Sequence, residues 1–193
     1  MTRAFSAALA GLALALSQPL AADGSNISAQ IVEESDGTRT LVHEAVIDAP
    51  LGAVWSTLST EEGWKNWGPK FARFDFRTGG SIETGYHDGA KPGDAQNIRH
   101  RILAIVPEQL IALKVEQVPE GGPVDLAVFE PTWGVYELSA LDEKRTRLRI
   151  SGYGYGPDDA SSRMLEFFKS GNVYSIELLR RNLAASNEGA MAE

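Results

Sequence analysis

The fold is decided by residues 157–185, which read PDDASSRMLEFFKSGNVYSIELLRRNLAA. Most apolar side chains in this stretch recur at spacings of three and four residues, which is typical of one face of an α-helix. The stripe consists of Leu165, Phe168, Asn172, Ile176, Leu179 and Leu183. Met164, Phe167, Tyr174 and Leu178 widen the apolar face and predict a helix packed deeply against a sheet. Gly171 is the weak point of this predicted helix, because glycine has low helix propensity.

The sequence before this helix consists mainly of alternating, β-branched segments that predict antiparallel strands. The predicted strands cover residues 40–49, 71–77, 81–87, 97–106, 109–117, 132–140 and 146–155. Gly79-Gly80 and Pro107-Glu108 are breaks of turn length, so the strands on either side of each break are expected to pair as hairpins. Pro131 separates an edge-like strand that begins at Leu126 from the strand that follows it.

Two short helices are predicted between the first and second strands. Pro50 ends the first strand and can begin a helix over residues 51–59. Thr60 is a suitable N-cap for a second short helix. That helix carries Trp64 and Trp67 on one face and is expected to end at the Gly-Pro pair that follows.

This order of elements predicts an α+β fold: a curved antiparallel sheet of about six to seven strands wrapped around a long C-terminal helix. The long helix is the only predicted element large enough to cover one face of the sheet. Glycines at positions 79, 80, 85, 152 and 154 allow the sheet to bend sharply. A bent sheet and a straight helix diverge, so an apolar pocket is expected between them.

Composition excludes several classes of function. The 193-residue chain has a formal net charge of -8, which disfavours generic nucleic-acid binding. It contains no cysteine, so disulfides, thiolate metal sites and a cysteine nucleophile are excluded. His43, His87 and His100 fall on separate predicted strands and are interpreted as solvent-facing residues. No metal site and no cofactor are therefore expected.

The N-terminus has the pattern of a secretory signal peptide over residues 1–22. Arg3 precedes an apolar run that is too short to span a bilayer and ends in small residues. Residues 23–38 are expected to form a flexible segment, a tether or a ragged first strand. The domain itself is predicted over residues 39–185, followed by a disordered tail at 186–193. We therefore expect a periplasmic or secreted protein with no stable membrane span after cleavage.

Motifs spread over residues 40–183 carry a resemblance to a known superfamily. They are IDAP at 47–50, VW at 54–55, Trp64 and Trp67 with Pro69, FDFR at 74–77 followed by GG at 79–80, IVP at 105–107 and TRL at 146–148. On these residues the sequence resembles the START-like (SRPBCC) helix-grip superfamily. Within it, the sequence is similar to the branch of heat-shock-protein-90 ATPase activator homologue C-terminal domains. The resemblance implies the helix-grip fold, in which a short helix closes one end of a cavity.

Aromatic residues are the main candidates for the cavity wall. The predicted lining residues are Trp64, Trp67, Phe74, Phe76, Tyr86, Trp133, Tyr153, Phe168 and Asn172. Trp64 and Trp67 are expected at the mouth, so that replacing both by alanine weakens ligand binding and leaves the fold largely intact. Two charge pairs, Asp75 with Arg77 and Arg99 with Arg101, each share one face of a strand. They are interpreted as surface groups, the alternative being an arginine that binds a ligand carboxylate.

Three functions remain open on this sequence. The first is binding of a small apolar or amphipathic molecule in the cavity. The second is a cyclase-like or hydratase-like enzyme, in which polar residues such as Glu83, His100 or Tyr86 move protons. The third is a protein-interaction module without a ligand, whose protein partner the sequence does not identify. No catalytic residue can be assigned, and an enzyme would need a titratable group inside the cavity.

Overall fold

Within residues 27–190, which the computed structural model describes, eight strands form one antiparallel sheet in the order β1-β2-β8-β7-β6-β5-β4-β3. The strands are β1 (Ser28–Glu33), β2 (Arg39–Ile47), β3 (Phe71–Phe74), β4 (Ser81–Gly85), β5 (Ile98–Val106), β6 (Leu110–Gln117), β7 (Trp133–Ala140) and β8 (Thr146–Tyr155). The helices are α1 (Leu51–Ser59), α2 (Glu61–Lys65), α3 (Leu126–Phe129) and α4 (Asp159–Ala190). The predicted α+β class is confirmed, with slightly more strands than expected.

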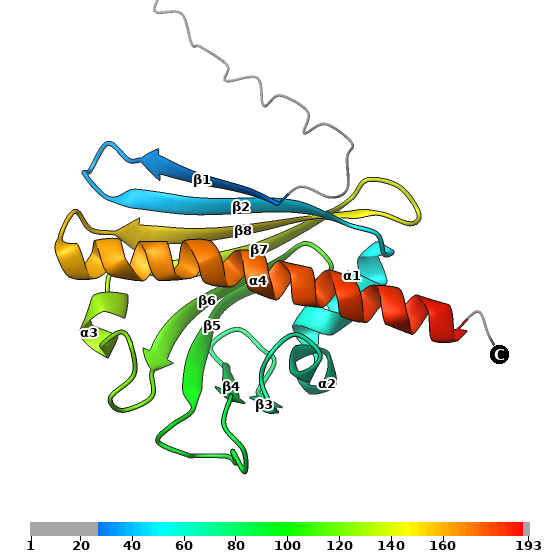
Figure 1. The fold of residues 1–193 in the computed structure, drawn as a ribbon, viewed down its shortest axis with the longest axis horizontal. Helices are drawn as coiled ribbons and strands as arrows, with labels where there is room; N and C mark the ends of the chain where they lie inside the picture. The colour runs from blue at the N-terminus through cyan, green and yellow to red at the C-terminus, as the bar shows by residue number, and fades with distance from the viewer. Residues whose placement is uncertain (1–26, 191–193) are drawn as a thin grey trace, which may run out of the picture.

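Helix α4 lies across the concave face of the curved sheet, as its periodicity predicts (Figure 1). The α4 side chains Leu165, Ile176 and Leu179 are fully buried between the helix and the sheet. Phe167 and Tyr174 were expected on the same face but are 52% and 62% exposed. At about 100° per residue, they lie roughly 160° and 180° around the helix from Leu165. The buried face of α4 is therefore narrower than the sequence predicts.

The ends of α4 are held by side-chain hydrogen bonds. Near its start, the Asp158 carboxylate accepts a hydrogen bond from the Ser161 amide at 2.9 Å. Toward its end, Arg180 donates two hydrogen bonds to the Val46 carbonyl on β2, at 2.8 and 3.1 Å. The helix is continuous through Gly171 and passes the predicted end at residue 185. Residues 191–193 of the predicted tail lie outside the described residues, and side chains are described only as far as residue 185.

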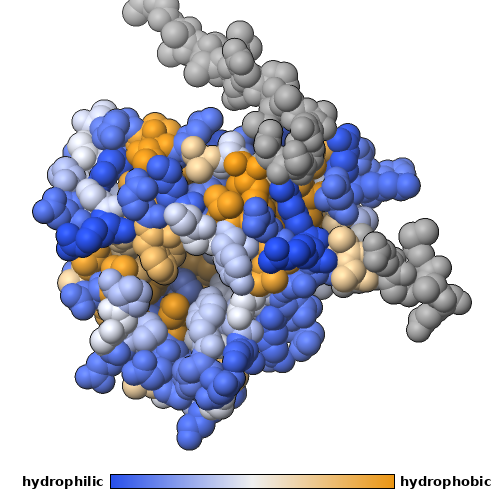
Figure 2. All heavy atoms as spheres, viewed as in Figure 1, coloured by the Kyte–Doolittle hydropathy of each residue, from blue (hydrophilic) through white to orange (hydrophobic). Residues whose placement is uncertain are grey.

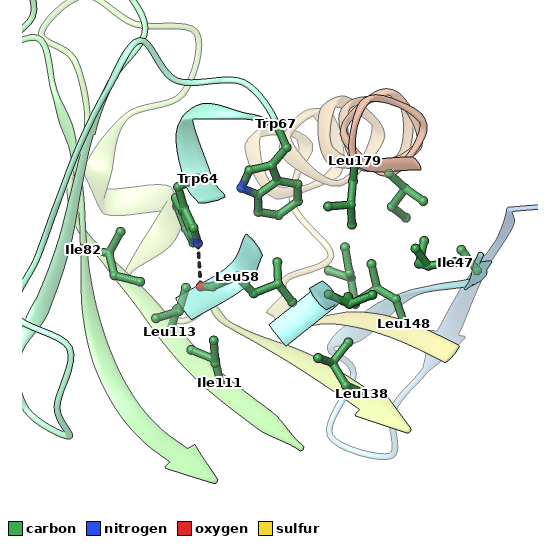
Figure 3. Packing of buried hydrophobic residues seen from close by; sticks show 14 of the residues in the cluster. Ile47, Leu58, Trp64, Trp67, Ile82, Ile111, Leu113, Leu138, Leu148 and Leu179 are labelled. Atoms are coloured by element: carbon green, nitrogen blue, oxygen red, sulfur yellow. Dashed lines mark hydrogen bonds between the residues drawn. The ribbon is translucent and has the colours of Figure 1, made fainter. Parts of the chain in front are cut away.

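Helices α1 and α2 pack at one end of the concave face. Helix α1 has the predicted bounds, and the Thr60 hydroxyl caps α2 by accepting a hydrogen bond from the Gly63 amide at 3.0 Å. Helix α2 ends at Lys65, so Trp67 lies in the turn after the helix rather than on it. The indole of Trp64 turns inward and donates to the Leu58 carbonyl at 2.7 Å (Figure 3).

Helix α3 corrects the prediction of an edge-like strand from Leu126. A four-residue apolar run does not distinguish a buried helix from a strand. Here the run follows Asp125 in extended conformation and closes into one helical turn. Phe129 of this turn packs edge-to-face against Phe168 of α4, with ring centroids 5.9 Å apart. Helix α3 therefore covers the open end of the sheet instead of extending it.

At the two edges of the sheet, the strands also differ from expectation. Of the alternatives for residues 23–38, the strand is observed, because β1 pairs with β2 from Ser28 to Glu33. At the other edge, β3 ends at Phe74 rather than at residue 77. After one more cross-strand hydrogen bond, from the Asp75 amide to the Ser81 carbonyl at 2.8 Å, the chain turns back, with the Gly80 amide donating to the Arg77 carbonyl at 2.8 Å. The predicted signal peptide, residues 1–22, lies outside the described residues.

The buried apolar residues form two clusters. The larger cluster joins the sheet to α1, α2 and the C-terminal half of α4, and contains Trp64, Trp67 and Leu179 (Figure 3). The smaller cluster contains Phe129 and Leu165 and lies where α3 meets the first half of α4. Between the two clusters, the sheet and α4 are not in full contact.

Candidate functional site

A two-lobed cavity lies between the concave face of the sheet and α4. One lobe, toward α3 and the start of β7, has a volume of about 100 Å³. The other, toward Trp64 and Trp67, has a volume of about 150 Å³. The two lobes share the residues His100, Val115, Phe129, Tyr136, Ile150, Phe168 and Asn172. This shared wall makes them parts of one site.

Strand alternation and helix periodicity place these side chains. His100, Val115, Tyr136 and Ile150 come from four neighbouring strands, β5 to β8, and point to the concave face. Phe168 and Asn172 are four residues apart on α4, so they lie one above the other on the face that looks at the sheet. In Figure 2 the surface is hollowed beside α4, over β5 and β6. The cavity therefore opens to solvent along this side of the helix.

The cavity wall is uncharged. Among the described residues that line the two lobes there is no Asp, Glu, Lys or Arg. Burial lowers the pKa of His100 to about 4, and a hydrogen bond with the Ile82 backbone opposes this shift only in part. Burial raises the pKa of Tyr136 and raises that of Tyr155 to about 12. All three side chains are neutral near pH 7, so the site offers hydrogen bonds without charge.

Six of the predicted site residues line the cavity. Trp64, Trp67 and Tyr86 line the larger lobe, Trp133 lines the smaller one, and Phe168 and Asn172 line both. Trp64 and Trp67 also belong to the core, because they are only 4% and 8% exposed. The more exposed aromatic residues are Tyr86 in one lobe and Trp133 in the other.

Phe74, Phe76 and Tyr153 are not among the residues that line the two lobes. Phe74 packs edge-to-face on Trp64, with centroids 5.6 Å apart, and stacks on Phe76. Tyr153 stacks on Trp133 with ring centroids 4.3 Å apart and an interplanar angle of 16°. The three rings therefore support lining residues from behind or beside them.

His100 and His43 correct the interpretation of the histidines as solvent-facing. His100 lines both lobes, and His43 on β2 is completely buried under α4. His87 is exposed, as expected. His100 shares strand parity with Ile102, which is fully buried in the structure. Alternation alone does not show which face of the sheet is concave, so the sequence analysis missed Val115, Tyr136 and Ile150 as well.

The predicted charge pairs lie outside the cavity, which confirms their interpretation as surface groups. Arg77 pairs with Asp75 at 2.9 Å, and Arg101 pairs with Glu116. Another hollow lies on the opposite face of the sheet, where Arg149 forms ion pairs with Glu44 and Glu137. Its arginine and glutamate side chains already neutralise one another, so it is a weaker candidate site.

Two further properties concern the described part of the chain only. No helix in residues 27–190 has the length and hydropathy required to cross a bilayer. In the same range, no three His, Asp or Glu side chains come together as a metal site would require.

Comparison with known proteins relates the chain to one family. The model of the family described as "Activator of Hsp90 ATPase homolog 1-like protein" matches residues 48–183. No curated protein sequence matches the chain.

Solved structures share the fold at low sequence identity. CalU16 from Micromonospora echinospora is 20% identical over 80% of this chain and 81% of its own, with a TM-score of 0.54. The Aha1 dimer from Colwellia psychrerythraea is 15% identical over 72% and 92%, with a TM-score of 0.53. The di-domain ARO/CYC BexL from the BE-7585A biosynthetic pathway is 14% identical over 76% of this chain but 47% of its own, with a TM-score of 0.60.

Proposed function

The chain belongs to the family of activator of Hsp90 ATPase homolog 1-like proteins, and from its helix-grip fold we propose that it binds a small apolar or amphipathic molecule in the cavity under α4. The protein would act by holding this molecule rather than by transforming it.

The observation that carries this proposal is the cavity itself. Aromatic and aliphatic side chains dominate its wall, and a few neutral polar groups are placed among them, as in most small-molecule sites. An apolar cavity of about 150 Å³ accepts a benzene-sized ring. The two connected lobes therefore suit a molecule of about two fused rings, or an aliphatic chain of similar volume.

A neutral dye tests the proposal. Prodan, an uncharged naphthalene dye, titrated into the protein, is expected to bind at one molecule per chain with enhanced emission. Val115→Phe puts a ring into the wall shared by both lobes and is expected to weaken this binding at least about tenfold, because the added volume competes with the dye. Leu103→Phe is the matched control, since Leu103 lies on β5 outside both lobes and is partly exposed. Equal binding by the two variants would contradict the proposal.

Native mass spectrometry supplies a second test. Protein purified from its own host and sprayed under gentle conditions is expected to carry a co-purifying small molecule. If neither a dye nor a natural ligand binds the folded protein, the interaction-module function replaces the binding function.

A second candidate is an enzyme of the cyclase or hydratase kind. Four titratable side chains in the cavity wall, His100 and three tyrosines (Tyr86, Tyr136 and Tyr155), favour it, and one structural neighbour is named an ARO/CYC. However, burial moves the pKa of His100 to about 4 and that of Tyr136 above its usual value. An effective general acid or base has a pKa near the working pH, so both groups are poorly suited to proton transfer near neutrality. Binding is therefore the first candidate.

We also propose that the protein is exported. The support is the order of a basic residue, an apolar run and small residues in positions 1–22. An exported protein would be separated from a cytosolic chaperone, so the name of the family does not supply its partner. N-terminal sequencing of protein from the periplasm or the medium is expected to begin near Asp23. Soluble protein that still begins at Met1 would contradict export.

A further inference from the structure

The cavity wall provides no partner for a charged ligand. None of the described lining residues is acidic or basic at neutral pH. Arg99 and Arg101 flank His100 on β5, so strand alternation directs them to the other face of the sheet. A carboxylate or ammonium group entering the cavity would lose its hydration without gaining an ion pair. The ligand is therefore expected to be uncharged.

His100 leaves a hydrogen-bond acceptor unsatisfied at the junction of the lobes. A neutral imidazole has one N–H donor and one accepting lone pair. Ile82, the residue paired with His100 across β4 and β5, favours the protonated ring through its backbone, as a carbonyl oxygen beside the imidazole does. The Nδ1 atom is enclosed and makes no hydrogen bond.

Trp67 adds an unsatisfied donor to the same wall. Its Nε1 is enclosed and has no hydrogen-bond partner, and its ring lines the larger lobe together with Trp64. A hydroxyl group both donates and accepts hydrogen bonds, so it can serve an acceptor such as His100 and a donor such as Trp67. A ketone or an ether only accepts, and would leave the imidazole lone pair without a partner.

We infer that the cavity selects an uncharged ring compound that carries a hydroxyl group, and that His100 is the residue that recognises this hydroxyl. The inference rests on the proposed binding function and adds the chemical class of the ligand to it. The hydroxyl donates to the imidazole, and the hydrocarbon skeleton fills the two lobes between Phe168 and the sheet.

Three compounds with one skeleton test the ligand class by isothermal titration calorimetry at neutral pH. They are 2-naphthol, 2-methylnaphthalene and 2-naphthoate, which carry a hydroxyl, a methyl of similar size and a charged carboxylate. The wild-type protein is expected to bind 2-naphthol about tenfold more tightly than 2-methylnaphthalene, because the hydroxyl gains a partner. No binding of 2-naphthoate is expected at the same concentrations.

Variants of the wall test the role of His100. His100→Phe keeps an aromatic ring beside Trp64, whose centroid lies 6.1 Å from that of His100, and removes the acceptor. It is expected to bind 2-methylnaphthalene within about threefold of wild type and to bind 2-naphthol at least about tenfold more weakly. His87→Phe is the matched control: it makes the same substitution at an exposed histidine outside both lobes and is expected to retain the preference for 2-naphthol.

The outcomes separate this inference from the proposed function. If wild-type protein binds 2-methylnaphthalene as tightly as 2-naphthol, or binds 2-naphthoate, the ligand class is wrong while the binding function stands. If His100→Phe keeps the preference for 2-naphthol, His100 is not the recognising residue. If neither prodan nor any of the three compounds binds, the binding function fails as well. The wild-type comparison needs no variant, so the ligand class is tested even if His100→Phe does not fold.

Discussion

Asn172 of α4 and His43 of β2 meet beneath the helix, with the amide Nδ2 3.4 Å from the imidazole Nδ1. Nε2 of the same ring lies 3.0 Å from the Lys169 carbonyl oxygen, which can only accept, so Nε2 carries the proton. Nδ1 is then the acceptor that faces the Asn172 amide. The imidazole therefore joins the helix to the sheet at the edge of the cavity, and Asn172 is held by it while lining both lobes.

Removing this imidazole is expected to destabilise the fold. His43→Leu fills a similar volume but loses the hydrogen bonds to Lys169 and Asn172, at a cost of about 1–3 kcal/mol in the free energy of unfolding. Urea unfolding followed by tryptophan emission measures this cost. The matched control is His87→Leu at an exposed position, expected within about 0.5 kcal/mol of wild type. Equal effects of the two substitutions would contradict a structural role for His43.

His43, which is buried, and His100, which lines the cavity, give the stability a defined pH dependence. Burial lowers the pKa of His43, and lowers that of His100 from 6.5 to about 4. Below pH 6.5 the unfolded chain binds protons that the folded protein excludes. The contribution of neutral His100 to the free energy of unfolding is therefore fully present above pH 6.5, and it is lost as the pH falls from 6.5 to about 4.

The measurement is the difference between wild type and His100→Phe in the free energy of unfolding at several pH values. The carboxylates titrate in both proteins, so the difference isolates the imidazole. Wild type is expected to lose up to about 3 kcal/mol relative to the variant across this range. A difference that is independent of pH, or that grows in favour of wild type on acidification, would rule out a buried neutral His100.

Elements with strong local signals could be predicted from the sequence. Helix α1 and strand β8 have the predicted bounds, because Pro50 and the Thr60 cap define the helix and β-branched alternation defines the strand. Helix α3 could not be predicted. Its four apolar residues fit either a strand or a helix, and only the contact of Phe129 with Phe168, far away in the sequence, favours the helical turn.

The existence and position of the cavity were predictable, but only part of its wall was. Trp64 and Phe168 could be assigned from their elements, because a short helix and a long apolar helix must both pack against the sheet. His100 could not be assigned, since alternation reveals which residues share a face but not which face is concave. The curvature and the α4 contact decide this, and both depend on pairing across the whole sheet.

Replacing Trp64 is expected to damage the fold and not only ligand binding. The indole is 4% exposed and donates a hydrogen bond to the Leu58 carbonyl at 2.7 Å. Trp64→Ala is expected to cost about 3–5 kcal/mol in denaturant unfolding. Trp64→Phe keeps most of the ring, loses the hydrogen bond and should cost about 1–3 kcal/mol. A loss below about 1 kcal/mol for Trp64→Ala would instead support the expectation that replacing this residue leaves the fold largely intact.

The two faces of α4 are expected to respond differently to truncation. Leu179 is fully buried against the sheet, so Leu179→Ala should cost about 2–5 kcal/mol through the cavity it leaves. Tyr174 is the most exposed large apolar residue on the same helix, and Tyr174→Ala should change stability by no more than about 0.5 kcal/mol. Thermal unfolding of both variants side by side provides the comparison. A large loss for Tyr174→Ala in a monomeric protein would mean that the orientation of α4 is wrong.

Two glycines with the same backbone conformation provide the last prediction. Gly79 and Gly154 have φ of +81° and +82°, so alanine is strained to a similar degree at both. A Cβ at Gly79 would meet nothing within 4 Å, whereas one at Gly154 would lie 2.2 Å from the Pro131 carbonyl oxygen. Gly79→Ala is therefore expected to cost about 1 kcal/mol, and Gly154→Ala about 2–4 kcal/mol, because the chain at Pro131 must move.

That movement connects the prediction to the site. Pro131 is followed by Thr132 and Trp133, which line the smaller lobe. A displacement of Pro131 should therefore change the shape of this lobe as well as the free energy of unfolding. Gly154→Ala is expected to weaken prodan binding several-fold under conditions where the variant remains folded, because the lobe next to β7 is distorted. Gly79→Ala, in the turn between β3 and β4, should bind the dye as wild type does. Equal unfolding free energies for the two variants would show that the close approach of β8 to Pro131 does not shape this end of the cavity.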